Sequence, residues 1–341
     1  MGSIKQRKKD HVELSVSGDA DYSYPTGFEQ YRFVHNALPE VDFDQVSTEA
    51  TLLGRSFSFP LFISSMTGGY ADAGRVNTII AEFCEKENLP FGVGSQRIML
   101  EDPKAEESFS VVREKAPNAF IASNIGGAQL IGGLPGEYID RLIQSISADA
   151  VIVHLNPLQE LMQPEGDRDF KGIEEGISKL TQESPVPVIV KETGAGISAD
   201  VAERLIERGV SVIDISGAGG TSWAKIENLR SQKSADREIF NDWGIPTVAS
   251  LRDVAGVKEK HSFELIASGG IRSSYDIVKA ICMGADFTAA AGPIIKTIMK
   301  EGREGLDRWY QNRKYQVRVI LTLLGCENFE QTGMKHLRTT V

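Results

Sequence analysis

The feature that most constrains the fold of this chain is a regular alternation of short apolar runs with helix-like segments. From Pro60 onward, eight runs rich in Val, Ile, Ala and Phe recur along the chain. Their nearly continuous apolar character predicts strands buried on both faces, as in a parallel sheet covered by helices. Eight strand–helix units favour a closed (β/α)8 barrel, the TIM barrel, over an open sheet. The predicted strands are residues 60–66, 91–95, 119–124, 150–155, 187–192, 211–217, 264–270 and 287–292.

Hydroxyl residues predict where several of the helices begin. A side-chain oxygen at the N-cap accepts a hydrogen bond from the first turn of a helix, so Ser and Thr are favoured there. The last barrel helix is expected to start at Pro293, because proline suits the first turn. The predicted N-caps are Ser198, Thr247 and Ser274.

The chain divides into three parts. Residues 1–58 are basic at first and then rich in Gly, Asp, Tyr and Pro, which predicts an N-terminal arm with short helical pieces. Residues 59–300 hold the repeating pattern and predict the barrel, and residues 301–341 predict a C-terminal helical extension. Residues 217–243 form a long insertion after the sixth predicted strand.

Composition limits the partners of the chain. The formal net charge of −10 argues against nucleic acid and anionic membrane surfaces. The three cysteines form no CxxC pair, which favours a reduced, cytoplasmic protein. No apolar run approaches the ~20 residues of a membrane span, and the polar start is unlike a signal peptide. We expect a small-molecule ligand and a homo-oligomeric protein.

Polar or glycine-rich residues follow nearly every predicted strand. In a (β/α)8 barrel the carboxyl ends of all strands meet on one face, and active sites lie there. These segments are therefore the candidate site. They are residues 65–69, 94–97, 123–126, 154–160, 191–194, 216–222, 269–272 and 291–292.

The segments after the last two strands predict a phosphate site. Residues 268–273 are Ser-Gly-Gly-Ile-Arg-Ser, and residues 290–293 are Ala-Ala-Gly-Pro at the start of a helix. Barrel phosphate sites are commonly built from these two loops, because glycine admits the backbone and a helix N-terminus favours anions. The alternative is a simple turn and a helix cap.

Lys191 ends the fifth predicted strand. A cation there suits an anion or the electron-rich side of a reduced flavin, and the alternative is a structural ion pair. Residues 194–199 also match the dinucleotide fingerprint, with Asp214 about 20 residues after Gly194. Because the same rhythm precedes and follows this motif, a tight turn of a barrel is favoured over a separate nucleotide-binding domain.

The segment after the fourth strand brings together an imidazole, two amides and a carboxylate: His154, Asn156, Gln159 and Glu160. Glu160 is a candidate Mg²⁺ ligand, because Mg²⁺ is commonly held by one or two carboxylates plus substrate phosphate. Taken singly, each of these residues could be structural. The basic run Arg7-Lys8-Lys9 could be a solvated tail or could supply cations to an anionic ligand.

Together these motifs resemble the type 2 isopentenyl-diphosphate delta-isomerases. The resemblance runs in unbroken order from about Arg7 to Pro293. It rests on residues 7–11, 66–69, 94–97, 154–160, 191–194, 217–223 and 268–272.

The resemblance implies an enzyme that interconverts isopentenyl and dimethylallyl diphosphate. It implies FMN, which NAD(P)H must reduce, and a divalent metal, usually Mg²⁺, held by Glu160. The implied catalytic residues are His154, Gln159 and Lys191. The implied FMN-binding residues are Ser65, Met66, Thr67, Gly68, Ser95, Asn124, Lys191, Ser216, Thr221, Gly270, Ile271, Arg272, Ala291 and Gly292. The implied substrate-binding residues are Arg7, Lys8, Ser95, Gln96, Arg97, His154, Asn156 and Gln159.

Such a reaction is redox-neutral and demanding. A proton must be added to an unactivated alkene, which is a very weak base, so an ordinary side-chain acid is poorly matched in pKa. The resemblance implies that reduced FMN serves here as an acid and base, while the protein supplies position and electrostatics.

Two other functions remain open at this stage. FMN-dependent 2-hydroxy-acid oxidases share the late phosphate loops, but they carry a His base after the sixth strand. Here that loop, residues 216–221, is Ser-Gly-Ala-Gly-Gly-Thr, and none of the five histidines lies in it. The loop also lacks the Cys that a nucleotide dehydrogenase of the guanosine pathway needs. The other alternative is a non-catalytic flavin-binding protein.

Overall fold

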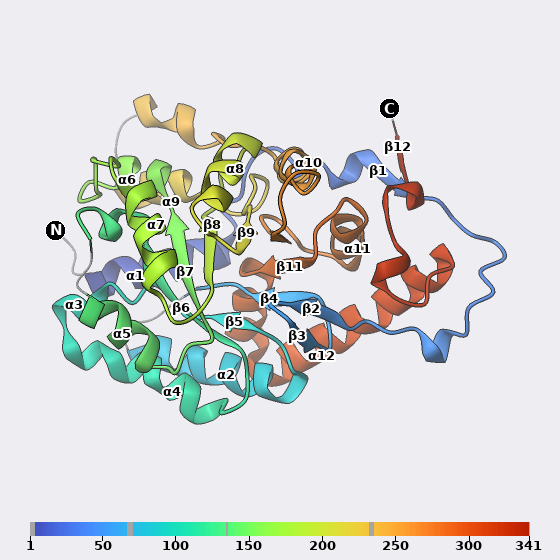
Figure 1. Cartoon of the computed structure of the whole chain (residues 1–341), viewed down its shortest axis with the longest axis horizontal. Coiled ribbons are helices and arrows are strands. Elements are labelled where there is room, and N and C mark those ends of the chain that lie inside the picture. Colours follow the sequence, from blue (N-terminus) through green and yellow to red (C-terminus); the bar gives the residue numbers. More distant parts are fainter. Residues whose placement is uncertain (1–3, 67–70, 134–135, 232–234, 341) are drawn as a thin grey trace.

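A computed structural model describes residues 4–66, 71–133, 136–231 and 235–340. Its centre is a closed barrel of eight parallel strands in chain order, which confirms the predicted (β/α)8 fold (Figure 1). Each predicted strand overlaps one observed strand. The strands are β4 (Leu61–Ile63), β5 (Phe91–Gly92), β6 (Ile121–Gly126), β7 (Ala150–Leu155), β8 (Val188–Glu192), β9 (Val212–Asp214), β10 (Glu264–Ala267) and β11 (Phe287–Ala290). Of these, β6 alone runs past its predicted end, to Gly126.

Helices surround the barrel on the outside (Figure 1). The helices that follow the eight barrel strands are α2 (Ala71–Glu87), α4 (Glu107–Lys115), α5 (Gly136–Gln144), α7 (Ile173–Glu183), α8 (Ala199–Glu207), α10 (Thr247–Val257), α11 (Ser274–Cys282) and α12 (Gly292–Leu324). Helix α12 continues across residue 300, where the predicted barrel would pass into the C-terminal extension. It is broken at Gly302, whose φ of 64° and ψ of −154° are not helical.

Shorter helices and strands lie in the loops after the barrel strands and in the two terminal regions of the chain. The loops after the strands add α3 (Ile98–Glu101), η3 (Pro103–Glu106), η4 (Gly127–Leu130), α6 (Pro157–Met162), α9 (Trp223–Ser231) and η5 (Ala235–Phe240). The N-terminal arm contains α1 (Ile4–Ser17), η1 (Phe28–Gln30), β1 (Tyr31–Phe33), η2 (Phe43–Gln45), β2 (Ala50–Leu52) and β3 (Arg55–Phe57). The chain ends with η6 (Phe329–Gln331), η7 (Met334–His336) and β12 (Leu337–Thr339).

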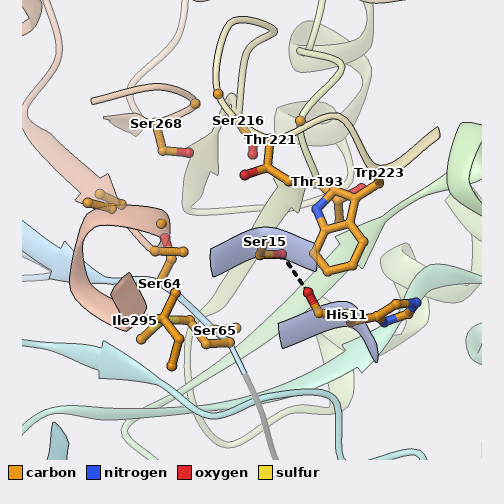
Figure 2. A pocket seen from close by; sticks show the side chains of 18 of the residues that line it. His11, Ser15, Ser64, Ser65, Thr193, Ser216, Thr221, Trp223, Ser268 and Ile295 are labelled. Carbon is orange, nitrogen blue, oxygen red and sulfur yellow. Dashed lines mark hydrogen bonds between the residues drawn. The ribbon is translucent and has the colours of Figure 1, made fainter. Parts of the chain in front are cut away.

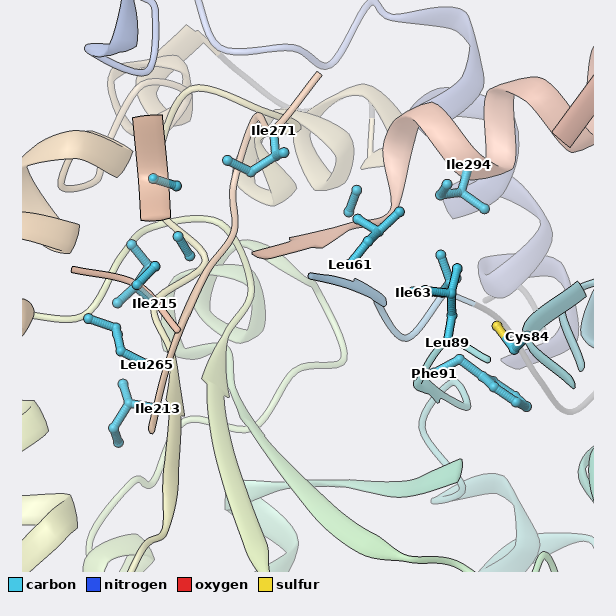
Figure 3. Close-up of a cluster of buried hydrophobic side chains, with 14 of the residues drawn as sticks. Leu61, Ile63, Cys84, Leu89, Phe91, Ile213, Ile215, Leu265, Ile271 and Ile294 are labelled. Carbon is cyan, nitrogen blue, oxygen red and sulfur yellow. The ribbon is translucent and has the colours of Figure 1, made fainter. Parts of the chain in front are cut away.

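The barrel strands are apolar on both faces because they separate two cores. Along β4, Leu61 and Ile63 pack against the outer helices, whereas Phe62 between them faces the interior of the barrel. This alternation follows the two-residue period of a strand. Figure 3 shows part of the outer core, with Leu89 and Phe91 below Leu61 and Ile63. The hairpin β2–β3 joins the inner core through Leu52 and Phe57.

The two terminal regions of the chain meet in one small sheet. Strand β1 pairs antiparallel with β12, with Arg32 opposite Arg338. Figure 1 shows these strands together at the upper right, beside the C-terminus. Among the helices of the described ranges, none is both long and apolar enough to cross a bilayer.

The predicted N-caps are correct in one case of three. The Ser198 side chain accepts from Val201 N, as predicted. Ser274 is instead the first residue of α11, and its neighbour Ser273 forms a capping box with Asp276. The prediction chose the wrong member of a Ser-Ser pair, because only Ser273 can pair with an acidic residue three positions later.

Thr247 is also not an N-cap, because α10 starts at Thr247 itself and follows Pro246. Its hydroxyl donates to the carbonyls of Ala218 and Gly269 at 3.1 and 2.7 Å. The side chain therefore ties the loop after β9 to the loop after β10. Helix α12 starts at Gly292, one residue before the predicted Pro293.

Candidate active site

A cavity of about 650 Å³ opens at the carboxyl ends of the barrel strands. Figure 2 shows it from close by, with His11 and Trp223 on one side and Ser64, Ser65 and Ile295 on the other. The cavity gathers most of the predicted site residues. Those that line it are Ser65, Met66, Ser95, Arg97, Asn124, His154, Asn156, Gln159, Glu160, Lys191, Ser216, Thr221, Gly270, Ile271, Arg272, Ala291 and Gly292.

Five predicted residues stand apart from this set. Gln96 is fully buried outside the cavity, where its amide donates to Leu142 O and Ser145 Oγ. Thr67 and Gly68 lie outside the described residues. Arg7 and Lys8 lie in α1, and the structure describes the course of that helix but not these two side chains.

The loops after β10 and β11 form an anion-binding end. Gly269 and Gly270 have φ values of 95° and 71°, which glycine adopts readily. Helix α12 begins here without a side-chain cap, and the space where Gly292 would carry a Cβ is open. The first N–H groups of a helix lack partners within the helix and attract phosphate. This end therefore fits the phosphate of a cofactor such as FMN.

Two cations border the same end of the cavity. Arg272 and Lys296 both line it, and both lie near the Asp21 carboxylate, at 3.5 and 3.9 Å. Arg272 also donates to Gly219 O at 2.9 Å. These contacts hold the two positive charges beside the glycine-rich loops, where they complement an anionic group.

Ser65 carries a buried hydroxyl without a partner. Its Oγ is enclosed and makes no hydrogen bond within the part of the chain that the structure describes. Gly92 leaves room for it, because a Cβ there would lie 2.7 Å from Ser65 Oγ. Buried polar groups are nearly always paired, so an orphan at a cavity wall points to a bound ligand. The hydroxyl fits a polar edge of a flavin.

Lys191 reaches the cavity from the end of β8. The residue is buried, and its Nζ donates to Glu192 O at 2.6 Å. Within the described residues no carboxylate lies within ion-pair distance of Nζ, which argues against the structural ion pair left open above. Asp214 on the neighbouring strand still feels this charge, since burial raises the Asp214 pKa and Lys191 opposes the rise.

Glu192, next in the chain, points away from Lys191 and holds the following loop. One of its carboxylate oxygens accepts hydrogen bonds from the backbone of Gly194, Ala195 and Gly196. Burial raises the pKa of Glu192 to about 7, although the Ala195 and Gly194 N–H groups and the Lys191 charge oppose this rise. The N–H groups of residues 194–196, which in a nucleotide fingerprint would bind a phosphate, are here bound to a carboxylate of the protein itself.

His154 has a defined orientation in the cavity wall. Its Nδ1 lies 2.7 Å from Asn124 Oδ1, and an amide oxygen only accepts, so Nδ1 carries the proton. The other nitrogen, Nε2, lies close to the backbone of β6, since a Cβ on Gly126 would be 3.1 Å from it. Asn124 therefore fixes the tautomer of the histidine.

Asn156, Gln159 and Glu160 form one hydrogen-bonded cluster at the start of α6. Asn156 Nδ2 donates to Gln159 Oε1 at 3.2 Å and to Glu160 Oε1 at 3.0 Å. Glu160 is buried, yet it lines the cavity. The cluster presents oxygen atoms, the ligand type that Mg²⁺ prefers.

The described residues contain no group of three or more His, Cys, Asp or Glu side chains that could hold a metal by themselves. A single carboxylate such as Glu160 suits a Mg²⁺ ion that completes its shell with phosphate oxygens and water. The cluster thus fits a metal that binds together with a phosphorylated substrate.

A further pair at the cavity was missed by the sequence analysis. His11 Nε2 of α1 lies 2.7 Å from Glu227 Oε1 of α9, and Gln159 Nε2 donates to the same oxygen at 3.3 Å. Burial raises the Glu227 pKa, but His11 and Arg230 outweigh that effect, so the pKa lies below its ordinary value. His11 also meets the Trp223 ring edge-on, with centroids 5.0 Å apart.

Comparison with known proteins agrees with this geometry. A family model described as FMN-dependent dehydrogenase matches residues 154–339. The isopentenyl-diphosphate delta-isomerase of Chlorobium luteolum is 43% identical over 343 residues, covering 96% of this chain and 93% of that protein. The enzyme of the same name from Methanosarcina barkeri is 42% identical over 338 residues, covering 97% and 90%.

Solved structures of two other proteins share this fold. A flavocytochrome b2 variant has a TM-score of 0.70 at 16% identity, covering 98% of this chain and 83% of that one. A soluble mutant of (S)-mandelate dehydrogenase from Pseudomonas putida has a TM-score of 0.67 at 16% identity, covering 98% and 99%. These low identities show the fold alone. The identities above 40% confirm the resemblance found in the motifs, and the chain belongs to the isopentenyl-diphosphate delta-isomerase family, built on the FMN-dependent dehydrogenase barrel.

Proposed function

We propose that this protein interconverts isopentenyl diphosphate and dimethylallyl diphosphate with reduced FMN and a divalent metal. The observation that carries the proposal is a single cavity with two differently equipped ends. One end has the glycine-rich loops and the start of α12, and the other has His154, Gln159 and Glu160. A flavin phosphate and a substrate diphosphate each need such an end.

The first end is assigned to FMN. The phosphate would lie at Gly270, Arg272 and Gly292, and the ring system would extend toward Ser65 and Lys191. When bound and reduced, FMN supplies a weakly acidic group able to give and take a proton beside an alkene. The buried Lys191 ammonium supports this assignment, because it stabilises negative charge on a reduced ring.

The second end is assigned to the substrate diphosphate and its metal. Glu160 would hold Mg²⁺, while Arg97, His154 and Asn156 would contact phosphate oxygens. With Nδ1 bound to Asn124, His154 directs its other nitrogen away from that amide. Gln159 lies between Glu160 and the buried Glu227. Its amide oxygen accepts from Asn156, which also donates to Glu160, and its amide nitrogen donates to Glu227.

The N-terminal arm is assigned to closing the cavity. His11 and Ser15 of α1 line it, and His11 is anchored to Glu227. The same helix carries Arg7 and Lys8, which we propose to contact the diphosphate. Closure of α1 over the cavity would exclude water. Water would otherwise trap the cationic carbon that develops when the alkene is protonated.

The test is an anaerobic assay with isopentenyl diphosphate, FMN and Mg²⁺. We expect turnover only when NADPH or dithionite keeps the flavin reduced, with no net consumption of reductant. Equal rates with oxidised flavin would contradict the proposal. Replacing Arg7 and Lys8 by Ala should raise KM for the diphosphate and leave the FMN content unchanged.

Oxidation of a 2-hydroxy acid is the second candidate, because the fold matches (S)-mandelate dehydrogenase. The loop after β9 contributes Ser216, Gly217, Gly220 and Thr221 to the cavity. Among the described residues, the cavity histidines are His11 and His154, from α1 and β7. Bleaching of the flavin by mandelate or lactate would favour this second function.

Three further features belong to the proposal. NAD(P)H is the expected reductant of the flavin. The cytoplasm is the expected compartment, because the protein has three free, buried cysteines, which stay reduced there. A homo-oligomer is expected because Ile239 and Trp243 are largely exposed, at 75% and 61%. Light scattering of the purified protein tests the last point.

A further inference from the structure

One residue outside the cavity contacts three residues that line it. Asp167 lies in the loop after α6, and its Oδ2 accepts from Arg97 Nη1 and from Gln129 Nε2, both at 3.2 Å. Its backbone N–H donates to Glu160 Oε2 at 2.9 Å. Arg97, Gln129 and Glu160 all line the cavity, whereas Asp167 is not among the lining residues.

The course of the loop explains how one residue reaches all three. Gly166 N donates to Gln163 O at 3.1 Å and turns the chain back over α6. A Cβ on Gly166 would lie only 2.0 Å from Glu160 O, so the loop can cross the Glu160 backbone only because residue 166 is glycine. This close crossing brings the Asp167 N–H to the Glu160 carboxylate.

We propose that Asp167 is the positioning residue for the diphosphate end of the cavity. Its carboxylate orients Arg97 and Gln129, and its backbone N–H orients Glu160. The proposal rests on the proposed function and deepens it. It assigns the alignment of Arg97, which would bind the diphosphate, and of Glu160, which would bind the metal, to one residue that does not line the cavity.

The geometry of the Arg97–Asp167 contact indicates that Asp167 orients the guanidinium group and leaves part of it available to a ligand. Arg97 uses Nη1 toward Asp167, and within the described residues Asp167 is its only ion-pair partner. The remaining guanidinium nitrogens therefore stay available to a phosphate. Free arginine side chains lose much rotamer entropy on binding, so an arginine already held by one nitrogen binds a ligand at lower entropic cost.

An opposing effect has to be weighed. A carboxylate near an anionic substrate also repels it. The Arg97–Asp167 pair is about one-third exposed on both sides, at 37% and 36%, so solvent screens this longer-range repulsion. Orientation acts through direct hydrogen bonds and is not screened in this way. We therefore expect the loss of Asp167 to weaken substrate binding.

The experiment separates the side chain of Asp167 from its backbone. Asp167→Ala removes the acceptor, and Asp167→Asn keeps a neutral acceptor of the same shape, but both keep the N–H toward Glu160. We expect KM for isopentenyl diphosphate to rise roughly 10-fold in the Ala variant and about 3-fold in the Asn variant, with kcat nearly unchanged. The Mg²⁺ concentration for half-maximal activity should stay the same in both.

A second variant addresses the backbone contact. Gly166→Ala displaces the crossing over Glu160 and should raise the Mg²⁺ requirement as well as KM. In an Arg97→Gln background, Asp167→Ala should raise KM much less than it does alone, because the Arg97 contact is already lost and only the Gln129 contact remains to be removed. Asp169→Asn is the control: it is an exposed carboxylate two residues later that accepts a hydrogen bond from Lys171 N in its own loop.

A binding measurement makes the result independent of turnover. Calorimetry with inorganic pyrophosphate and Mg²⁺ on the FMN-loaded enzyme should show weaker binding in Asp167→Ala, with flavin spectrum and Tm as in the wild type. Unchanged or tighter pyrophosphate binding, together with an unchanged KM, overturns the role of Asp167. A wild type that binds pyrophosphate but does not isomerise the substrate refutes the proposed function, while weaker binding by Asp167→Ala still supports the positioning role.

Discussion

His11 Nε2 and Glu227 Oε1 lie 2.7 Å apart and join the first helix of the chain to the helix of the long insertion. Arg230, one turn further along α9, pairs with the same carboxylate. Removing one partner of a buried, charge-assisted contact is costly, because the other group is left without compensation. The pair is therefore expected to decide how firmly α1 closes the cavity.

Glu227→Gln should loosen α1 without unfolding the barrel. The amide keeps the shape but removes the negative charge that faces His11 and Arg230, while Arg230 keeps Asp10 and Glu165 as partners at 3.5 and 3.8 Å. We expect faster hydrogen exchange in residues 10–17 and a higher KM, with the Tm of the barrel nearly unchanged. Glu238→Gln, an exposed carboxylate of η5, is the control. Identical exchange in the two variants would show that α1 is held by other contacts.

The same carboxylate predicts an acid limit for closure. The pKa of Glu227 lies below its ordinary value of 4.5 in the folded protein. Its contribution to stability is therefore present above pH 4.5 and is lost as the pH falls through the lower folded pKa. The protection factors of the α1 amides, which correct for the intrinsic pH dependence of exchange, should stay constant near neutral pH and fall only in acid, and Glu227→Gln should abolish this fall.

Glu192 predicts a trend of the opposite sign. Its pKa rises from 4.5 to about 7 on folding, so the folded state keeps a proton that the unfolded state releases. Stability contributed by this group therefore falls as the pH rises from about 4.5 to about 7. Denaturant midpoints at several pH values should show this decline in the wild type and less of it in Glu192→Gln. Parallel curves for the two proteins would contradict the raised pKa.

Ser65→Ala should separate cofactor binding from folding. Because Ser65 Oγ has no partner among the described residues, removing it should not lower the Tm of the flavin-free protein. If the hydroxyl binds FMN, its loss should weaken FMN binding about 5-fold, or roughly 1 kcal/mol for one hydrogen bond. Flavin fluorescence titration measures the affinity. Ser110→Ala, at a half-buried position of α4 that does not line the cavity, is the control.

Glu160→Gln should weaken the metal-dependent step. The amide preserves the size of the side chain and removes the charge that Mg²⁺ requires. We expect metal-dependent substrate binding to weaken ~10-fold or more, at least 1.4 kcal/mol, with the flavin spectrum unchanged. Activity against Mg²⁺ concentration measures this. Glu165 is unsuitable as a control because it lies 3.8 Å from Arg230, so exposed Glu175 on α7 is used. An unaltered Mg²⁺ dependence would exclude Glu160 as the ligand.

The barrel and most of the cavity could be predicted because both depend on local pattern. A strand buried on two faces shows continuous apolar residues, and residues at or just after the ends of such strands reach the same face of the barrel, as Lys191 and Ser216 do. Several predicted strands were too long at their carboxyl ends, where the chain has already turned toward the cavity. Ser216, for example, has a φ of 37° and lies beyond the end of β9.

The missed residues owe their positions to tertiary contacts. The local sequence around Glu227 does not distinguish it from a solvated carboxylate, whereas in the fold it contacts His11 of α1 and Gln159 of α6 and is buried. Gln129 lies in the short helix η4 and Asp167 in the loop after α6, and no local pattern reveals the course of either segment. Gln96 is the converse case: it stands within a motif of cavity residues, but its side chain turns inward and accepts from Asn124 N at 3.0 Å.

The pairing of β1 with β12 sets an order of events for a chain synthesised from its N-terminus. Residues 31–33 cannot complete their sheet until residues 337–339 have left the ribosome. The barrel, whose strands are complete by residue 290, can form first. Helix α1 is held separately, because its His11 binds Glu227 of α9, which is synthesised long before residue 337. A nascent chain stalled before residue 337 should thus hold a barrel whose residues 31–33 still lack their partner strand.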